Sequence, residues 1–396
     1  MYVTRRLSVF RKSPEALSCL PPDGPNSGIL VIQDEEVEQI SCLGLEYNDL
    51  KLLPFPQNVK LELYYRAGIS VNRATHFHHV AFIPVLGEPL SSNKYYVIQQ
   101  NEKHRGEAYT SSKEEDFQMD SCCFYSSVSD LPLQHLDISN AYQQVEIFPK
   151  RSTITLRSGF SAKSVAPDGV PPKFLTRRWR VSATTSSESS FGEAAGIDDA
   201  LRAGLPEFNF SLARKSSDSV VVGKWYCPFM FIKEGSKTLR EEIRKTMFYE
   251  MTLEQKWEQI FSCENDGMEG NRVMVNAGVE KEVVVVADRE AVHKQIDISE
   301  GLMWFRSYNN VGTEASVGLS TAIVERMKWE QERSGWIEGK EKEVRVERVE
   351  ELKGNSGWKK FGCYVLVESF VLKRLDGSLV LTYSFRHTHQ IRTKWE

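Results

Sequence analysis

The sequence predicts an α+β fold of predominantly antiparallel β-sheets with a central helical segment, divided into two domains. Short runs of β-branched and aromatic residues, separated by Gly, Pro and Asn, indicate strands through most of the chain. The strongest hairpin signal is Asp376-Gly377 between the alternating runs Phe361–Leu375 and Ser378–Ile391. Near the middle, apolar side chains recur every four residues, as on one helix face. These are Leu239, Ile243, Met247 and Met251.

The N-terminal part begins with a short predicted helix and continues as strands. Ser13 is placed to cap the helix and Pro14 to occupy its first position. Ser112–Glu115 fits a capping box and predicts another short helix. The predicted strands are Ile29–Gln33, Val59–Tyr65, Val80–Leu86 and Tyr95–Gln99.

A basic stretch precedes the predicted domain boundary. Residues 150–180 hold eight Lys and Arg against one acid, Asp168, so this stretch carries +7 and the remainder of the -4 chain carries -11. Ser- and Thr-rich segments at 182–190 and 211–219 follow and are typical of linkers. We therefore expect domains 1–215 and 216–396.

The C-terminal domain is expected to start with a strand at Gly223–Ile232 and two helices within residues 237–262. Its later part is expected to be β-structure. Val283–Val286 is an apolar strand, and Val317–Trp329 with Val344–Val349 predicts a hairpin around Ser334-Gly335.

Composition excludes several classes of protein. The 396 residues are 41% hydrophobic and 26% charged, which is typical of globular proteins. Apolar runs such as Val283–Ala287 fall far short of the ~20 residues that span a bilayer, so no membrane association is expected. Residues 1–17 lack an apolar signal-peptide core, and the seven cysteines are scattered. We expect reduced thiols and a cytoplasmic location, with the nucleus as the alternative.

Familiar catalytic and cofactor motifs are missing from the sequence. It contains no phosphate-binding loop, no dinucleotide-binding glycine motif, no G-x-S-x-G and no H-E-x-x-H. We therefore assign no catalytic residue, cofactor or metal, and favour a protein that is not an enzyme.

Two sets of residues leave room for enzymatic chemistry. His76 and His78 share one strand face, as do His387 and His389, and the two pairs together could supply a metal with imidazoles. The alternative is a set of histidines at strand edges. Cys227 could be a nucleophile, but its aromatic neighbours favour a small buried side chain.

The segment Arg177, Arg178, Trp179 and Arg180 is the candidate anion-binding site. Guanidinium groups beside an indole ring can hold single strands and other anionic ligands. The alternative is a solvated arginine face over a buried Trp179. Because the whole chain is acidic and shows no nucleic-acid module, nucleic acid is not the expected partner.

Several long segments together resemble one known family. They are Met1–Leu7, Gly24–Glu36, Leu53–Asn58, Phe82–Leu86, Leu90–Ile98, Gly223–Phe229 and Met247–Trp257. In these segments, from Met1 to about Phe261, the chain is similar to the plant-specific uncharacterised family called domain of unknown function 1262. The resemblance implies a flowering-plant source and one shared architecture, and it carries over no catalytic residue.

The sequence thus leaves three functional hypotheses. The favoured one is a non-enzymatic intracellular binding or interaction protein with protein partners. The others are an enzyme with an unrecognised, His-metal site and an anion or nucleic-acid binder that uses Arg177–Arg180.

Overall fold

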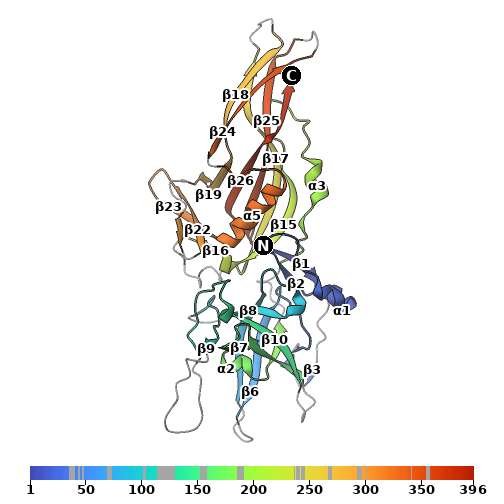
Figure 1. The fold of residues 1–396 in the computed structure, drawn as a ribbon, viewed down its shortest axis with the longest axis vertical. Coiled ribbons are helices and arrows are strands. Elements are labelled where there is room, and N and C mark those ends of the chain that lie inside the picture. Colours follow the sequence, from blue (N-terminus) through green and yellow to red (C-terminus); the bar gives the residue numbers. More distant parts are fainter. Residues whose placement is uncertain are drawn as a thin grey trace. The chain divides into compact units, whose positions relative to one another are not determined.

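The structure, a computed structural model, describes residues 1–34, 41–42, 45–46, 49–68, 74–100, 104–113, 130–151, 158–184, 191–235, 237, 241, 246–265, 270–291, 297–299, 301–339, 341–353 and 357–396 (Figure 1). Two compact units divide the chain. The N-terminal unit comprises Met1–Ala194 and Pro228–Phe248, and the C-terminal unit comprises Ala195–Cys227 and Tyr249–Glu396. A single border between residues 215 and 216 was expected. The division differs from it, because each unit consists of two segments and the chain crosses between the units three times.

The N-terminal unit is built mostly from strands. Its strands are β1 (Tyr2–Arg6), β2 (Gly28–Ile32), β3 (Ser41–Cys42), β4 (Leu45–Glu46), β5 (Asp49–Leu50), β6 (Lys60–Ala67), β7 (Ala74–Pro84), β8 (Lys94–Gln99), β9 (Ser112–Lys113), β10 (Gln144–Arg151), β11 (Ser158–Ser164), β12 (Gly169–Val170), β13 (Arg180–Thr184) and β16 (Ile232–Glu234). Its helices are α1 (Leu7–Lys12), α2 (Lys173–Thr176) and the 3-10 helices η1 (Pro14–Ser18), η2 (Leu90–Ser92), η4 (Ala141–Gln143) and η6 (Phe229–Phe231).

One sheet of this unit closes around an aromatic core. Its strand order is β11-β10-β8-β7-β6-β13-β5. Phe160 of β11 exchanges two backbone hydrogen bonds with Trp179, at 2.8 and 3.0 Å, next to β13. Trp179 is fully buried and stacks on Phe82 with ring centroids 5.7 Å apart. Trp179 therefore joins the edge strand β11 to the segment that leads into β13, and the sheet encloses the apolar side chains of alternate strand positions.

The C-terminal unit is a long antiparallel sheet with one substantial helix. Its strands are β14 (Gly196–Ile197), β15 (Val220–Pro228), β17 (Phe248–Glu264), β18 (Arg272–Glu280), β19 (Glu282–Val286), β20 (Arg289–Glu290), β21 (Asp297–Ser299), β22 (Leu302–Tyr308), β23 (Glu314–Ser320), β24 (Glu343–Glu351), β25 (Lys360–Arg374) and β26 (Leu379–Trp395). Its helices are α3 (Asp199–Gly204) and α5 (Thr321–Arg333). The central strand order is β15-β17-β25-β26-β19-β20, β18 pairs with β24, and β21, β22 and β23 form a meander.

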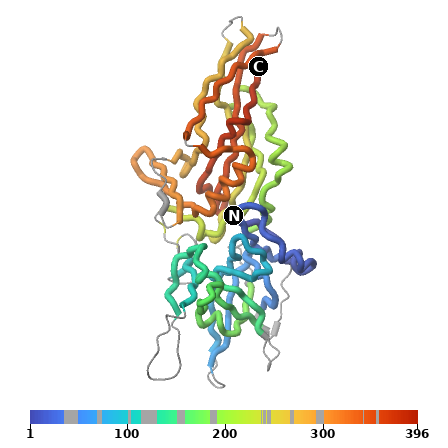
Figure 2. The backbone as a smooth tube through the Cα atoms, in the orientation of Figure 1, coloured from blue at the N-terminus to red at the C-terminus, as the bar shows by residue number. Residues whose placement is uncertain are grey.

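The hairpin at Asp376-Gly377 is confirmed. Strands β25 and β26 pair from Phe361↔Trp395 to Lys373↔Leu379 and run side by side along the unit (Figure 2). Gly377 has φ +84°, a left-handed backbone conformation that favours glycine. The predicted strands near residues 29–33, 59–65, 80–86, 95–99 and 283–286 are confirmed as well.

The α+β prediction with a central helical segment was wrong, because the described molecule is mostly β-structure. Within the predicted helical range 237–262, residues 248–262 belong to β17, which pairs with β25. A spacing of four residues fits a strand as well as a helix, because it is a multiple of two. In β17 every second side chain from Tyr249 to Trp257 is buried, and Thr252 between them is buried as well. Most of residues 237–245 lie outside the described residues.

Two local predictions were also wrong in the type of secondary structure. The stretch Val317–Trp329 ends strand β23 and then forms α5, and Val344–Val349 in β24 pairs with β18 and not with that stretch. Helix α5 buries Ile323, Met327 and Glu330 on one face. Ser112-Lys113 forms strand β9, and the rest of the helix predicted there lies outside the described residues.

Replacing the hairpin glycine tests the turn. Gly377→Ala should lower the stability of the C-terminal unit by about 1 kcal/mol, because alanine is strained at positive φ. Gly357→Ala is the matched control, since a Cβ meets no atom within 4 Å at either position and Gly357 has no positive φ. Thermal unfolding followed by circular dichroism measures both. Equal melting temperatures for the two variants would contradict the expectation.

Candidate functional site

A cavity of about 290 Å³ lies within the C-terminal unit. It is lined by residues of α3, β17, β25 and β26 and of the C-terminal end of α5. The lining residues are Asp199, Arg202, Ala203, Leu205, Gln255, Arg333, Ser334, Leu366, Glu368, His387 and Gln390. Its volume is near the lower end of the range of small-molecule sites, roughly 300–1,000 Å³.

Strand register places a polar pair on an otherwise apolar sheet face. Gln255 of β17 lies directly opposite Glu368 of β25. The neighbouring pairs on the same face, Leu253↔Phe370 and Trp257↔Leu366, are buried and apolar. Side chains at alternate positions share a face, so this register fixes Glu368 beneath the cavity.

Helix α3 brings Arg202 onto Glu368. The side chain of Asp198 caps the helix by accepting a hydrogen bond from the Leu201 amide at 2.9 Å. Arg202 Nε donates to Glu368 Oε1 at 2.9 Å, and its Nη2 donates to Oε2, which makes a bidentate pair. Gln255 Nε2 donates to Oε1 at 2.7 Å. Burial alone would raise the pKa of Glu368, but the hydrogen bonds from His387 and Arg202, together with the charge of Arg202, outweigh it and hold the pKa well below its usual range.

A second buried carboxylate, Glu330 of α5, completes this ionic cluster. Arg326 donates to Glu330 at 2.6 Å, and Arg202 and Arg333 each lie 3.5 Å from it. Burial raises the pKa of Glu330 despite the three arginines. Arg202 also donates to the Glu330 carbonyl and to Ser334 Oγ, so it joins α3, α5 and β25.

His387 enters the cavity through an irregularity in β26. The pairing with β25 shifts between Val365↔Ile391 and Leu366↔His387, so residues 388–390 bulge out of the ladder. His387 Nε2 lies 2.9 Å from Gln331 Oε1 and 3.7 Å from Glu368 Oε2. Both are acceptors, so we assign the proton to Nε2. In this tautomer the other ring nitrogen, His387 Nδ1, is a hydrogen-bond acceptor.

Two buried acceptors at the cavity have no partner among the described residues. They are His387 Nδ1 and Gln255 Oε1, and each residue is 1% exposed. A buried polar atom without a partner costs free energy unless water or a ligand satisfies it. The lining charges balance, with Arg202 and Arg333 against Asp199 and Glu368. The cavity therefore suits a neutral molecule that donates hydrogen bonds.

The four-histidine metal site, which the sequence left open as an alternative, is not formed in the part of the chain that the structure describes. Among the described residues, no group of three or more His, Cys, Asp or Glu could hold a metal ion. His78 stacks on Phe174 at 4.2 Å, and His76 stacks on Tyr65 at 5.1 Å, in the N-terminal unit. Of the four histidines, only His387 lines the cavity described above.

The predicted anion segment is split between core and surface. Trp179 is in the core, where its Nε1 donates to the Leu175 carbonyl at 3.0 Å, so its ring faces are not offered to a ligand. Arg177 and Arg178 are exposed, and Arg177 lies 5.6 Å above the Tyr65 ring. Arg180 lies 3.5 Å from Asp49. An anion site at the three arginines stays a prediction.

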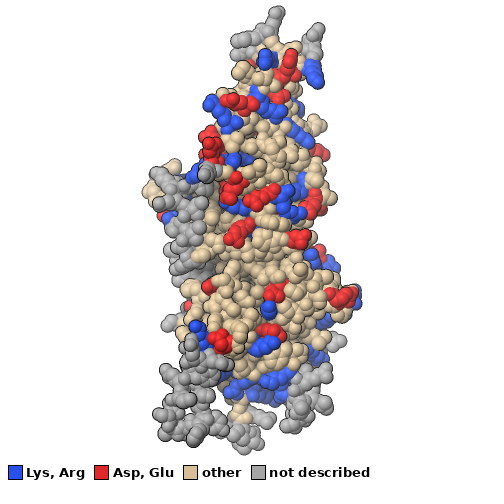
Figure 3. Space-filling model, in the orientation of Figure 1, with Lys and Arg blue, Asp and Glu red and all other residues tan. Residues whose placement is uncertain are grey.

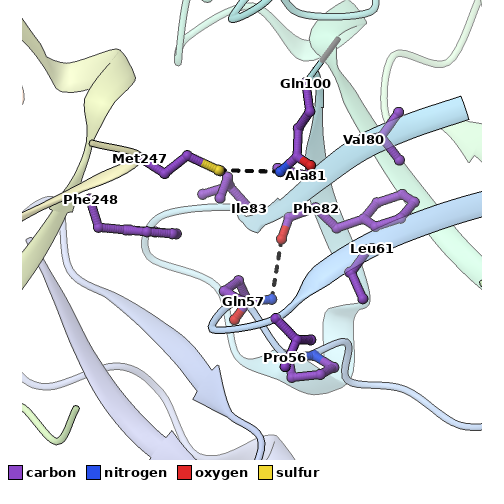
Figure 4. Close-up of a pocket in the computed structure, with 11 residues that line it drawn as sticks. Pro56, Gln57, Leu61, Val80, Ala81, Phe82, Ile83, Gln100, Met247 and Phe248 are labelled. Atoms are coloured by element: carbon purple, nitrogen blue, oxygen red, sulfur yellow. Dashed lines mark hydrogen bonds between the residues drawn. The ribbon is translucent and has the colours of Figure 1, made fainter. Parts of the chain in front are cut away.

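Two other features suit packing better than chemistry. Cys227 is fully buried, and burial raises its pKa to about 11, so the thiolate that a nucleophile needs is not formed at neutral pH. In the N-terminal unit, a pocket lined by Gln57, Phe82, Gln100 and Met247 has about 10 Å³, room for one water at most (Figure 4). Gln57 donates to the Phe82 carbonyl and Gln100 to Met247 Sδ, both at 3.2 Å.

Sequence reasoning did not identify Arg202, Gln255 or Glu368. One signal was present, because Glu368 is the only acid in the apolar run of β25. An acid in a buried strand needs a partner. The partner is 166 residues away and could not be chosen from spacing.

Comparison with known proteins leaves the function open. Residues 23–124 match the model of a family described as a protein of unknown function, DUF1262. No curated protein matches the chain. A solved structure titled "Crystal structure of Cry35Ab1" is similar at 10% sequence identity and a TM-score of 0.46, covering 86% of this chain and 90% of that chain. Nothing about that protein is carried over at this distance. Among the described residues, no helix has the length and apolarity to cross a membrane.

Removing one side of the buried ion pair should be costly. Glu368→Gln removes the bidentate partner of Arg202 and leaves it only Glu330, which Arg326 and Arg333 share, so the free energy of unfolding of the C-terminal unit should fall by about 3–5 kcal/mol. Arg214→Ala, which removes the exposed pair with Asp218, is the control and should change little. The double variant Arg202→Met/Glu368→Met should recover most of the loss, because no charge is then left alone. Denaturant titration measures all three, and a double variant worse than Glu368→Gln would contradict the assignment.

The same pair predicts a pH dependence of known sign. The folded-state pKa of Glu368 lies below its ordinary value of 4.5, so its contribution is full above that pH and is lost as the pH falls towards the folded pKa. The stability difference between wild type and Glu368→Gln should therefore shrink on acidification below about pH 4.5. The pKa of Glu330 is raised, so its contribution to stability falls as the pH rises. The stability difference between wild type and Glu330→Gln should therefore change with pH in the opposite direction, which makes this variant the informative comparison. A difference that grows in acid would show that Glu368 is not held ionised.

Proposed function

We propose that this protein is a non-enzymatic binding protein whose cavity in the C-terminal unit holds a small, neutral, hydroxyl-rich molecule such as a sugar or polyol. The observation that carries the proposal is the pair of buried, unpartnered acceptors at the cavity, Gln255 Oε1 and His387 Nδ1. Hydroxyl groups would donate to both, and a neutral ligand leaves the balanced charges of the lining undisturbed.

The lining supports binding over catalysis. Ser334 carries the single hydroxyl among the lining residues, and its Oγ is engaged, donating to the Gln331 carbonyl at 2.8 Å and accepting from Arg202 at 2.9 Å. A hydroxyl in those bonds is not poised as a nucleophile. Arg202 and Glu368 are likewise committed to each other, so they shape the site and leave the ligand to the two acceptors.

The remaining parts of this proposal come from the sequence. An intracellular location is inferred from the scattered cysteines, and the four thiols that the structure describes, Cys19, Cys227, Cys263 and Cys363, are free. The resemblance of residues 1–261 to the plant-specific family adds a plant source. Protein partners and an anion site at Arg177, Arg178 and Arg180 stay separate predictions.

Isothermal titration calorimetry with glucose, myo-inositol and glycerol tests the proposed ligand class. At least one should bind saturably to the wild-type protein. Ala203→Leu, which adds a larger side chain to the lining, should lower the affinity at least about tenfold. Ala200→Leu is the matched control, because Ala200 is on the same helix and does not line the cavity. Binding that is unchanged in Ala203→Leu, or heat from none of the three compounds, would contradict the proposal.

A further inference from the structure

A second cavity, of about 230 Å³, lies in the C-terminal unit on residues that the proposed function does not use. It is formed by the segment after α5, by the residue before β19, and by residues of β24 and β26. Its lining residues are Lys281, Gly335, Trp336, Ile337, Val344, Arg386, Thr388 and His389. None of them lines the first cavity.

The charge of this lining is of one sign. Lys281 and Arg386 are cationic, and no Asp or Glu lines the cavity. Glu258 neutralises Arg386, because it accepts from Arg386 Nη2 at 2.7 Å. Lys281 Nζ donates to the Ile337 carbonyl at 3.3 Å and forms no ion pair with a carboxylate among the described residues. One positive charge at the cavity is therefore not compensated.

A buried donor adds a second, independent observation. Trp336 is 3% exposed and packs edge-on against Phe385, with ring centroids 5.2 Å apart. Its Nε1–H has no hydrogen-bond partner among the described residues. Indole nitrogen only donates, and so does an ammonium group. Whatever satisfies Trp336 and Lys281 together must accept hydrogen bonds.

The turn after α5 passes close to His389 at the second cavity. Gly335 has φ +89°, and a Cβ there would lie 3.0 Å from His389 Nε2, so the glycine allows the turn to approach that ring. The residue before it, Ser334, lines the first cavity, and the residue after it, Trp336, lines the second. Neighbouring residues of one turn thus line two cavities that differ in chemistry, since the unpartnered buried atoms are acceptors at the first and a donor at the second.

The geometry points to an oxyanion-binding site in this second cavity, with Trp336 Nε1–H and Lys281 Nζ as donors to a carboxylate or a phosphate group. Both groups offer several acceptor oxygens and a negative charge that matches the uncompensated Lys281. This inference does not rest on the proposed polyol site, and either could fail without the other.

The indole resonances of tryptophan test the site directly. The chain has 8 Trp, so ¹⁵N-indole labelling gives a small set of N–H peaks, and the peak missing in Trp336→Phe belongs to Trp336. Sodium phosphate and sodium acetate are titrated separately, with sodium chloride at the same ionic strength as the reference. The Trp336 peak should shift saturably with at least one oxyanion. Phosphate alone assigns a phosphate group, acetate alone a carboxylate, and both a general oxyanion site.

Lysine variants give the second readout. Lys281→Ala should lower the affinity for the oxyanion about tenfold or more, because a charge-assisted hydrogen bond is lost. Lys353→Ala is the matched control, since Lys353 is exposed and does not line the cavity. A Trp336 peak that moves with none of the salts, or equally with chloride, would overturn the inference. So would an affinity that Lys281→Ala leaves unchanged.

Discussion

The buried pair between Arg202 and Glu368 is the interaction on which the arrangement of the C-terminal unit depends. Burying two charges costs several kcal/mol each, and only a bidentate geometry with further hydrogen bonds offsets that cost. Here Gln255, Ser334 and the Glu330 carbonyl supply those bonds. If β25 slipped by one residue against β17, Glu368 would point to the other face. The main effect of the pair is therefore to select one register of β25 against β17 and one position for α3 and α5. Its net contribution to stability is secondary.

The polar cavity follows from this cluster. A sheet face that must hold Glu368 cannot be packed as an apolar core, and the bulge at residues 388–390 lets His387 turn towards the carboxylate. On the face of this unit visible in Figure 3, acidic and basic side chains are intermixed. Surface ion pairs of the unit include Arg348–Glu350 and Lys360–Glu264. The distinctive chemistry of the unit thus lies inside it. The single turn from Ser334 to Trp336 contributes to both cavities, one with unpartnered acceptors and the other with an unpartnered donor.

The sequence was sufficient where structure is decided locally. The turn at Asp376-Gly377 needs positive φ and alternating flanks, and both are visible in the sequence. It was insufficient where one pattern fits two structures, as the spacing of Met247 and Met251 fits helix and strand alike. The ionic cluster at the first cavity could not be predicted from the sequence. Arg202 and Glu368 are far apart in the chain, and their meeting depends on strand pairing that no local signal encodes. His387 was named only as one of four histidines that could be metal ligands or strand-edge side chains, because its neighbours were unknown.

The arginines beside Trp179 have a structural cause in the N-terminal unit. Trp179 joins β11 to the segment before β13 through its backbone bonds to Phe160, and its ring fills the core beside Phe82. A residue that closes a sheet in this way must be buried, so the side chains around it are left to cover the outside. Arg177 and Arg178 are exposed there, and Arg180 reaches Asp49 of β5. Their place outside the core beside Trp179 is thus accounted for by closure, whereas nothing described in the fold accounts for the buried acceptors Gln255 Oε1 and His387 Nδ1. An unsatisfied group that packing does not explain is the stronger indication of a ligand.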